Sequence, residues 1–124
     1  MRSPAAPDPI GPYSQAIAHG GWLFASGQIP IDPATGKLVA GDVETQTERA
    51  IKNLAAVLEA GGSSLGRVVR STIYLTDLSL FPEVNAVYAK YFCSDPPPAR
   101  ATVGVASLPL GAAVEIDAIA ITDR

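Results

Sequence analysis

Cysteine, histidine and tryptophan each occur only once among the 124 residues. A lone cysteine, Cys93, cannot form an internal disulfide and has no partner for a structural zinc site. The single histidine, His19, stands beside two glycines, where an exposed turn residue is its ordinary role. A metal site needs clustered ligands that the chain does not offer. We therefore expect no metal or other cofactor, and a reducing, cytoplasmic location.

Long apolar runs and clustered basic residues are also lacking. No stretch of 18 or more apolar residues is available to span a bilayer. The opening residues 1–7 lack the apolar core of a signal peptide, so secretion is not expected. The net charge is −3, and the lysines and arginines are dispersed. Binding to a phosphate backbone depends on clustered basic side chains, so nucleic acid is not an expected partner.

The composition that is present suits one compact unit. Apolar residues make up 48% of the chain, which is enough to build a packed interior at this length. The 11 glycines and 11 prolines are scattered between apolar runs, a pattern typical of turns rather than disorder. We expect a single domain over residues 1–124.

The first third of the chain predicts one strand with turns on either side of it. Residues 10–19 form a turn-rich entry, and the glycines of residues 19–21 indicate a tight turn into a strand at 22–29. A second turn is expected at residues 32–37, where proline and glycine take positions that turns favour.

The central part predicts a helix followed by a strand. Asp42 is a suitable N-cap, apolar residues then recur at helical spacing, and Gly61 and Gly62 supply the stop. Residues 68–75 indicate a strand, with one side formed by Val69, Ser71, Ile73 and Leu75 and the other by Val68, Arg70, Thr72 and Tyr74.

The last third predicts a second helix and two strands. Ser79 is a candidate N-cap for a helix that tolerates Pro82 in its first turn and ends before residues 95–98. Its buried stripe would comprise Phe81, Val84, Tyr88, Tyr91 and Phe92. Strands are expected at about 100–106 and 113–121, separated by a turn at 108–111.

This order of elements predicts an α+β two-layer sandwich, in which two helices cover one face of a mixed sheet. A chain this short has nothing left to cover the other face. We therefore predict homo-oligomerisation through that face.

Few residues could carry chemistry. Ser26 before Gly27 resembles a nucleophile elbow only superficially, and no phosphate-binding loop is present. Arg100 follows three prolines, a rigid mounting for a guanidinium suited to a carboxylate. Glu115 alternates into an apolar strand, where burial would raise its pKa and make it a general acid/base. Taken alone, a surface salt bridge for Arg100 and a solvated Glu115 are the commoner roles.

Four segments stand out as motifs: Gly-Pro-Tyr-Ser-Gln-Ala at residues 11–16, Ser-Gly-Gln-Ile-Pro at 26–30, the segment 98–109, and Val-Glu-Ile-Asp-Ala at 114–118. Together they resemble the Rid/YjgF family, the reactive intermediate deaminases that are also called L-PSP endoribonucleases. Asn85 also falls where the family has an asparagine. The blocks occur in the family's order and spacing.

The resemblance implies a homotrimer of chorismate-mutase-like subunits with clefts at subunit boundaries. It further implies cofactor-independent hydrolysis of 2-iminopropanoate and 2-iminobutanoate to 2-keto acids and ammonia. Arg100 would then hold the substrate carboxylate, Glu115 would position or deprotonate the attacking water, and Tyr13 would line the pocket. The backbone at Ser26 and Gly27 would add a further contact. Thr102 stands where many members have cysteine, and could replace its packing and add a hydrogen bond.

Two alternatives stay open at this point. The chain could be a non-catalytic module that binds a small carboxylate or a partner protein through the same arginine. It could also be an endoribonuclease, although its acidity weighs against that reading. A simple hairpin through residues 108–111 would pair Arg100 nearer Ile119 than Glu115. The two residues would then converge through side-chain reach or across a subunit boundary.

Overall fold

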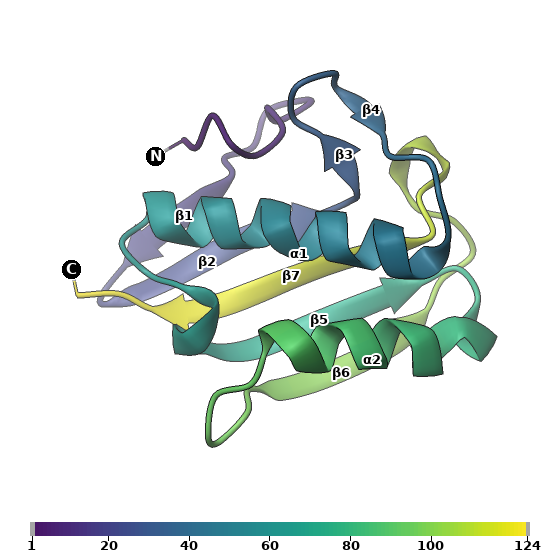
Figure 1. Ribbon diagram of the computed structural model, residues 1–124. Helices are drawn as coiled ribbons and strands as arrows, with labels where there is room; N and C mark the ends of the chain where they lie inside the picture. Colours follow the sequence, from purple (N-terminus) through teal and green to yellow (C-terminus); the bar gives the residue numbers. More distant parts are fainter. Residues whose placement is uncertain (1, 124) are drawn as a thin grey trace.

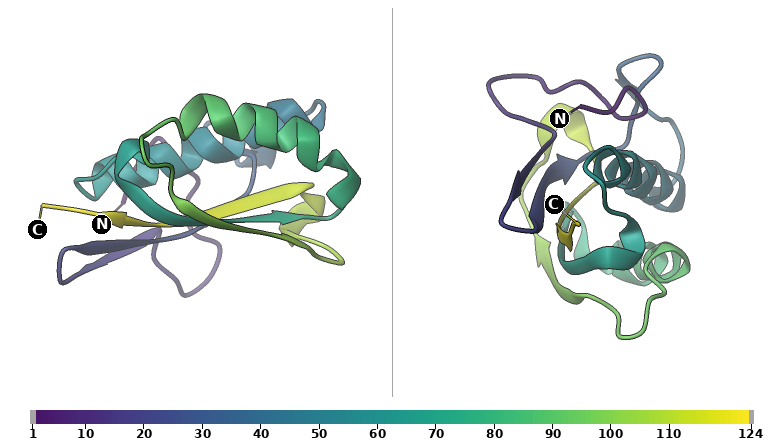
Figure 2. Two further views of the ribbon diagram at one scale, coloured as in Figure 1. Left: turned by 90° about the horizontal axis from the view of Figure 1, so that it is seen from below. Right: turned by 90° about the vertical axis from the view of Figure 1, so that its left-hand side faces the viewer.

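The computed structural model describes residues 2–123 as two layers, with two helices packed against one face of a five-stranded sheet (Figures 1 and 2). The sheet has the order β1-β2-β7-β5-β6, and a separate two-stranded sheet joins β3 to β4. The bounds are β1 (Ala16–His19), β2 (Trp22–Gln28), β3 (Ile31–Asp32), β4 (Lys37–Leu38), α1 (Val43–Ala60), β5 (Val68–Leu75), α2 (Phe81–Tyr91), β6 (Ala99–Gly104) and β7 (Val114–Ile121). Short 3₁₀ turns occupy Leu65–Arg67, Leu78–Leu80 and Pro109–Gly111. Within residues 2–123, no helix combines the length and the apolar character needed to cross a membrane.

The sheet is mixed, as predicted. β6 runs parallel to β5, while the other neighbouring strands are antiparallel. The turn between β1 and β2 places Gly20 and Gly21 at φ values of 59° and 83°, a left-handed region that glycine enters without steric cost. The predicted α+β architecture with helices on one face is therefore confirmed.

The start of the chain differs from the prediction. The turn-rich entry at residues 10–19 contains a strand, β1, which pairs with β2 at the sheet edge. Only Ala16 of its four residues is buried, so the segment shows no alternating pattern that would indicate a strand. Pairing with β2, rather than local sequence, makes it extended.

Helix α1 begins and ends where the sequence predicts. The Asp42 carboxylate accepts a hydrogen bond from Thr45 N at 2.8 Å, which satisfies one of the free amides of the first turn. The helix ends at Ala60, and Gly62 follows with φ at 82°. The predicted strand at 68–75 coincides with β5.

The predicted cap of the second helix is wrong. Ser79 lies in the 3₁₀ turn Leu78–Leu80, and the Asp77 carboxylate accepts hydrogen bonds from its backbone N at 3.0 Å and its Oγ at 2.7 Å. Asp77 therefore caps that turn, and α2 begins at Phe81 with Leu80 as an N-cap that makes no side-chain bond. Pro82 does lie in the first turn, as predicted.

The core lies between the helices and the sheet. Leu23, Leu54, Ile73, Val84 and Ile116 are all inaccessible to solvent there. Burial of each such side chain contributes about 1.5–3 kcal/mol. Within residues 2–123, no helix covers the opposite face of the sheet (Figure 2). Together with the outer strands it exposes large apolar side chains, namely Ile17, Trp22, Phe24, Val103 and Ile121.

The two last strands do not form a hairpin. β6 and β7 each pair with β5, which lies between them. Because β6 and β7 lie on opposite sides of β5, the chain must cross from one side of β5 to the other after residue 104, and the segment 105–113 makes that crossing. The simple hairpin expected through residues 108–111 is therefore wrong.

Candidate functional site

A cleft of about 380 Å³ opens where β2 ends and β7 begins. Four segments that are distant in the sequence form it: residues 7–15, residues 26–31, the turn at Pro109 and Leu110, and Glu115 of β7. Four of the sequence-predicted site residues meet in it, namely Tyr13, Ser26, Gly27 and Glu115. We call this set of residues the carboxylate cleft.

Glu115 is the acid of the carboxylate cleft. It pairs with Tyr74 of β5 on the sheet face that the helices leave uncovered. Burial raises the pKa of its carboxyl above the ordinary value, and the neighbouring Asp117 carboxylate raises that pKa further by charge repulsion. The sequence prediction of a partly buried glutamate with a raised pKa agrees with this arrangement. A carboxyl with a raised pKa is better suited than an ordinary glutamate to accept and return a proton.

Gly27 lies directly against this acid. Any Cβ at position 27 would overlap the Glu115 carboxylate, so the close approach requires glycine. The preceding residue, Ser26, donates a hydrogen bond from Oγ to Ser14 O at 2.6 Å. The Ser26 hydroxyl is therefore engaged with the backbone at Ser14. This agrees with the sequence analysis, which rejected Ser26 as a nucleophile.

Tyr13 stands at the edge of the cleft. Its side chain is about half exposed, and its Oη accepts a hydrogen bond from Ile10 N at 3.3 Å. The ring is therefore held by the turn on which it sits and lines the cleft.

Leu110 and several other lining residues were missed by sequence reasoning. Leu110 adopts φ 59°, a left-handed conformation that costs a non-glycine residue roughly 1–2 kcal/mol. Gln15 and Gln28 also line the cleft. Gln15 stands inside the motif at residues 11–16, which was the available signal for it. Nothing in the sequence marks Leu110 beyond its place in a Leu-Pro-Leu-Gly turn.

Arg100 lies elsewhere, on β6. It pairs with Ser71 of β5, and its guanidinium stands over the rings of Phe81 and Tyr88 of α2, at 5.3 and 4.8 Å from their centroids. Its Nη1 donates a hydrogen bond to Asn85 Oδ1 at 2.7 Å. We call Arg100, Asn85, Phe81 and Tyr88 the arginine cluster.

The arginine cluster fixes the direction of the exposed Arg100 guanidinium. Cation–π contacts on two aromatic faces and the bond to Asn85 fix the guanidinium while it stays exposed to solvent. Burial raises the pKa of the Tyr88 hydroxyl, while its bond with Ser71 and the nearby Arg100 charge lower it. Thr102, two residues along β6, pairs with Ile73 on the same side of the strand as Arg100 and is partly buried.

Arg100 and Glu115 are not brought together within one chain. Ser71, the register partner of Arg100, faces the helices and bonds the Tyr88 hydroxyl at 2.6 Å. Tyr74, the register partner of Glu115, points to the other face, where it donates a hydrogen bond to Asp117. The carboxylate cleft and the arginine cluster therefore stand on opposite faces of the sheet.

No three or more histidine, cysteine, aspartate or glutamate side chains gather at metal-binding distance anywhere from residue 2 to residue 123. His19 ends β1 in an exposed position, and Cys93 is exposed.

Comparison with known sequences matches residues 3–122 to the family described as Endoribonuclease L-PSP. The chain belongs to this family. A Reactive Intermediate Deaminase A of Arabidopsis thaliana chloroplasts is 50% identical over 93% of this chain and 61% of that protein. Protein DfrA of Myxococcus xanthus is 56% identical over 98% of this chain and 94% of its own length.

Solved structures place the chain among the Rid proteins. YyfA of Yersinia pestis, a protein of the Rid family, has a TM-score of 0.94 at 49% identity and covers 98% of this chain and 96% of its own. TdcF of E. coli, solved with bound serine, has a TM-score of 0.92 at 38% identity over 99% of this chain and 98% of its own. The sequence resemblance to the Rid/YjgF family, and the fold it implied, are confirmed.

Within this Rid protein the family motifs divide between two places. The motifs at residues 11–16 and 26–30 and the one around Glu115 converge on the carboxylate cleft. Arg100 and Asn85 meet in the arginine cluster. The family blocks that follow one another in the sequence thus supply two separate chemical surfaces.

Proposed function

We propose that this protein hydrolyses small 2-imino acids, of the 2-iminopropanoate and 2-iminobutanoate kind, to 2-oxo acids and ammonia. The observation that carries the proposal is the partly buried Glu115 carboxyl, whose pKa is raised in a cleft with largely apolar walls. Membership of a family that includes a Reactive Intermediate Deaminase supports the same reaction class.

The substrate requires two groups that one chain keeps apart. Arg100 would hold the substrate carboxylate through its fork of donors, and Glu115 would act on the water that attacks the imine carbon. We therefore propose a homotrimer in which the arginine cluster of one subunit faces the carboxylate cleft of the next. The apolar side chains left exposed on the sheet, including Trp22 and Phe24, support burial against another subunit.

The proposed reaction needs no electron transfer and no cofactor. Water oxygen bonds to C2, the π electrons of the C=N bond move to nitrogen, and Glu115 carries the water proton to that nitrogen. In the second step the new hydroxyl gives its proton to Glu115 as the C–N bond breaks. The same proton passes to the departing nitrogen, which leaves as ammonia. One carboxyl thus serves as base and then acid in both steps.

The first test follows the imine directly. An amino-acid oxidase generates the imine, and semicarbazide competes for it, so an active deaminase lowers the yield of semicarbazone. Wild-type protein should suppress the semicarbazone, and Arg100→Ala should not. No suppression by wild type with alanine- or 2-aminobutanoate-derived imines would overturn the proposal. Affinity for 2-oxobutanoate without turnover would then favour the carboxylate-binding module.

A second test addresses the shared site. Arg100→Ala and Glu115→Gln chains, co-expressed with different tags and purified as mixed oligomers, should regain activity that neither parent has. Some interfaces in the mixture pair an intact Arg100 with an intact Glu115. The matched control mixes Glu115→Gln with Gly27→Ala, which damage the same cleft and should not complement. Absence of recovery in the first mixture would contradict a site built from two subunits.

A further inference from the structure

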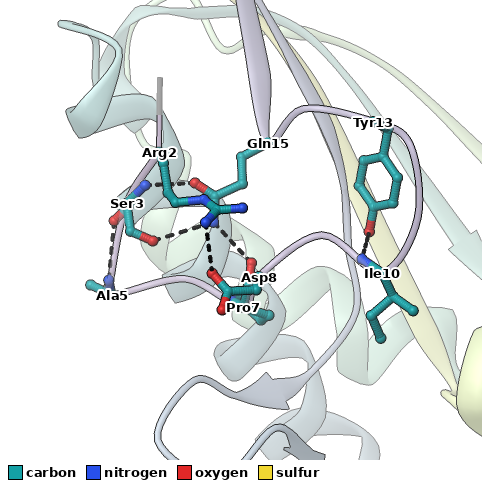
Figure 3. A network of polar contacts seen from close by, with 8 residues as sticks. All are labelled: Arg2, Ser3, Ala5, Pro7, Asp8, Ile10, Tyr13 and Gln15. Carbon is teal, nitrogen blue, oxygen red and sulfur yellow. Dashed lines mark hydrogen bonds and ion pairs between the residues drawn. The ribbon is translucent and has the colours of Figure 1, made fainter.

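Gln15 is a buried polar side chain that joins the start of the chain to the sheet. It is only 2% exposed, and it stands directly before β1. Its Oε1 accepts a hydrogen bond from Ser3 N at 2.6 Å, and its Nε2 donates to Ser3 O at 3.2 Å and to Pro7 O at 2.8 Å (Figure 3). All three contacts go to backbone atoms of the segment 3–7.

The backbone of Gln15 is joined to the floor of the carboxylate cleft. Ser26 N donates to Gln15 O at 2.9 Å, and Ser26 Oγ donates to Ser14 O. Ser26 precedes Gly27, which lies against the Glu115 carboxylate. One residue thus links the cleft floor through its main chain to the entry segment through its side chain.

The entry segment depends on such external contacts because it has few of its own. Prolines occupy positions 4, 7, 9 and 12, and each removes a backbone donor. Within residues 2–13, the backbone bonds are Ala6 N to Ser3 O at 3.4 Å and Tyr13 N to Gly11 O at 2.9 Å. The surface ion pair of Arg2 with Asp8, at 3.8 Å, adds little because both side chains are largely exposed.

This segment is one wall of the carboxylate cleft, through Pro7, Asp8, Pro9, Ile10 and Tyr13. The wall that contains Ile29 and Ile31 is also held by a side-chain amide. Asn53, fully buried in α1, donates from Nδ2 to Ile29 O at 3.1 Å and to Ile31 O at 2.8 Å. A side-chain amide therefore secures each wall, but the Asn53 wall also contains β3 and the Gln15 wall contains no strand.

We propose that Gln15 is a positioning residue that holds the wall formed by residues 7–13 against the carboxylate cleft, and so sets how tightly the cleft encloses its substrate. The proposal rests on the function proposed above for that cleft. Gln15 takes no part in proton transfer, because its side-chain amide does not titrate and its three bonds go to backbone atoms of residues 3–7. Its loss should weaken substrate binding while leaving the chemical step nearly intact.

Two variants break the contact from opposite sides. Gln15→Met keeps the length of the side chain and loses all three bonds. Ser3→Pro removes the Ser3 N–H donor, together with the Oγ that accepts from Ala5 N, and keeps the two bonds that Gln15 Nε2 donates. Gln15→Met should raise KM for 2-iminobutanoate about tenfold, because three hydrogen bonds hold the wall. The kcat should change less than about twofold, because the wall contributes to substrate binding and not to the chemical step. Ser3→Pro should raise KM by a smaller factor. The double variant should add nothing to Gln15→Met, because both changes act on one contact.

Two matched controls separate positioning from general stability. Ser3→Ala leaves the three bonds intact because they involve Ser3 backbone atoms, so its KM should equal that of wild type. Thr122→Val removes the buried bond from Thr122 Oγ1 to Gly61 O at the far end of β7. It should lower the melting temperature without moving KM. A KM that rises equally in Thr122→Val and Gln15→Met would overturn the positioning role.

Hydrogen exchange tests the contact without reference to activity. The Ser3 amide should exchange faster in Gln15→Met than in wild type, while amides of β2 keep their protection. Unchanged exchange at Ser3 would overturn the inference whatever the activity. If wild type shows no imine hydrolysis, the proposed function fails, and the affinity for 2-oxobutanoate then replaces KM as the readout for the Gln15 wall. Equal affinity in wild type and Gln15→Met would also overturn the inference.

Discussion

The carboxylate cleft and the arginine cluster handle their charges by opposite physical means. Glu115 is partly buried beside Asp117, and both effects raise the pKa of its carboxyl. Arg100 stays exposed, and two aromatic rings and an asparagine fix its direction. An acid that must exchange protons gains from burial, because desolvation brings its pKa toward neutrality. A cation that must bind an anion gains from orientation, because its charge is permanent.

The two regions also differ in how far they reach along the chain. The arginine cluster draws on β6 and α2, and its Arg100–Asn85 bond spans 15 residues. The carboxylate cleft joins residues 7–15, 26–31, 109–110 and 115. Disturbing the cleft should therefore affect several segments together, whereas disturbing the cluster should remain local.

Glu115→Gln should produce the largest loss of activity. Removal of the only proton acceptor assigned to the reaction should lower kcat about 1,000-fold, within the usual range for general acid–base catalysis. Carboxylate binding should persist, because Arg100 is untouched. Steady-state kinetics with the imine assay checks both values, and a kcat within about tenfold of wild type would remove Glu115 from the mechanism.

The same variant should be more stable than wild type at neutral pH. The pKa of Glu115 is raised in the folded protein, so the folded state binds this proton more tightly than the unfolded chain. The contribution of Glu115 to the free energy of unfolding is therefore fully present at low pH and is lost as the pH rises through the pKa of the folded state. Glutamine does not titrate, so the variant does not undergo that loss. Thermal melts should show a higher Tm for Glu115→Gln at pH 7 and equal values at acidic pH, where wild-type Glu115 is protonated.

Gly27→Ala should rank next. The added Cβ would overlap the Glu115 carboxylate and displace it. Displacement of a reacting group by about 1 Å can lower the rate roughly 100-fold. The fold should survive, since Gly27 does not need a left-handed φ. A circular dichroism spectrum and Tm near those of wild type, together with the lower kcat, would locate the damage in the cleft. An unchanged kcat would show that the carboxylate can move without loss.

Arg100→Lys should have a smaller effect, concentrated in KM. Lysine keeps the charge but loses the planar fork that stacks on Phe81 and Tyr88. A charge-assisted hydrogen bond is worth about 1.5–3 kcal/mol, which corresponds to a rise in KM of about 10- to 100-fold. Titration with 2-oxobutanoate measures the same loss without turnover. A lysine variant that binds as well as wild type would show that binding needs only a positive charge at position 100 and not the planar fork of donors.

Asp117→Asn should give the smallest effect, a change in pH dependence. Asparagine removes the negative charge that raises the pKa of Glu115, while its side-chain oxygen can still accept from Thr72 N. The acidic limb of the profile of kcat/KM against pH should therefore move to lower pH. The shift should be modest, because burial is the larger cause of the raised pKa. No movement of the limb would assign that limb to another group.

Sequence reasoning succeeded where signals are local. Asp42 and Gly62 bound α1 as expected, because a cap and a left-handed glycine act within one turn. It failed at Ser79, because the Asp77 carboxylate accepts from Ser79 N and Oγ and so engages the hydroxyl that was expected to cap the helix. It also failed at β1, whose extended form depends on pairing with β2.

The candidate site was predictable residue by residue but not as an arrangement. Tyr13, Ser26, Gly27 and Glu115 were expected to share a pocket, and they line one cleft. A separation of Arg100 from Glu115 was anticipated, but from a hairpin that does not form. Its actual cause, β5 lying between their two strands, was not derivable. Phe81 was expected only as part of a buried stripe, yet its ring also supports Arg100.

The sequence by itself determined the α+β class, the bounds of the long helix, the family and the chemical types of the candidate residues. These follow from periodicity, caps and short motifs, which act over a few residues. Only the tertiary structure decided which strands are neighbours, which face each charged residue occupies, and that Gln15 and Asn53 hold the two walls of one cleft. Alternation within a strand shows which residues share a side. It does not show which strand lies beside it or what covers that side, because long-range packing of the whole chain selects both.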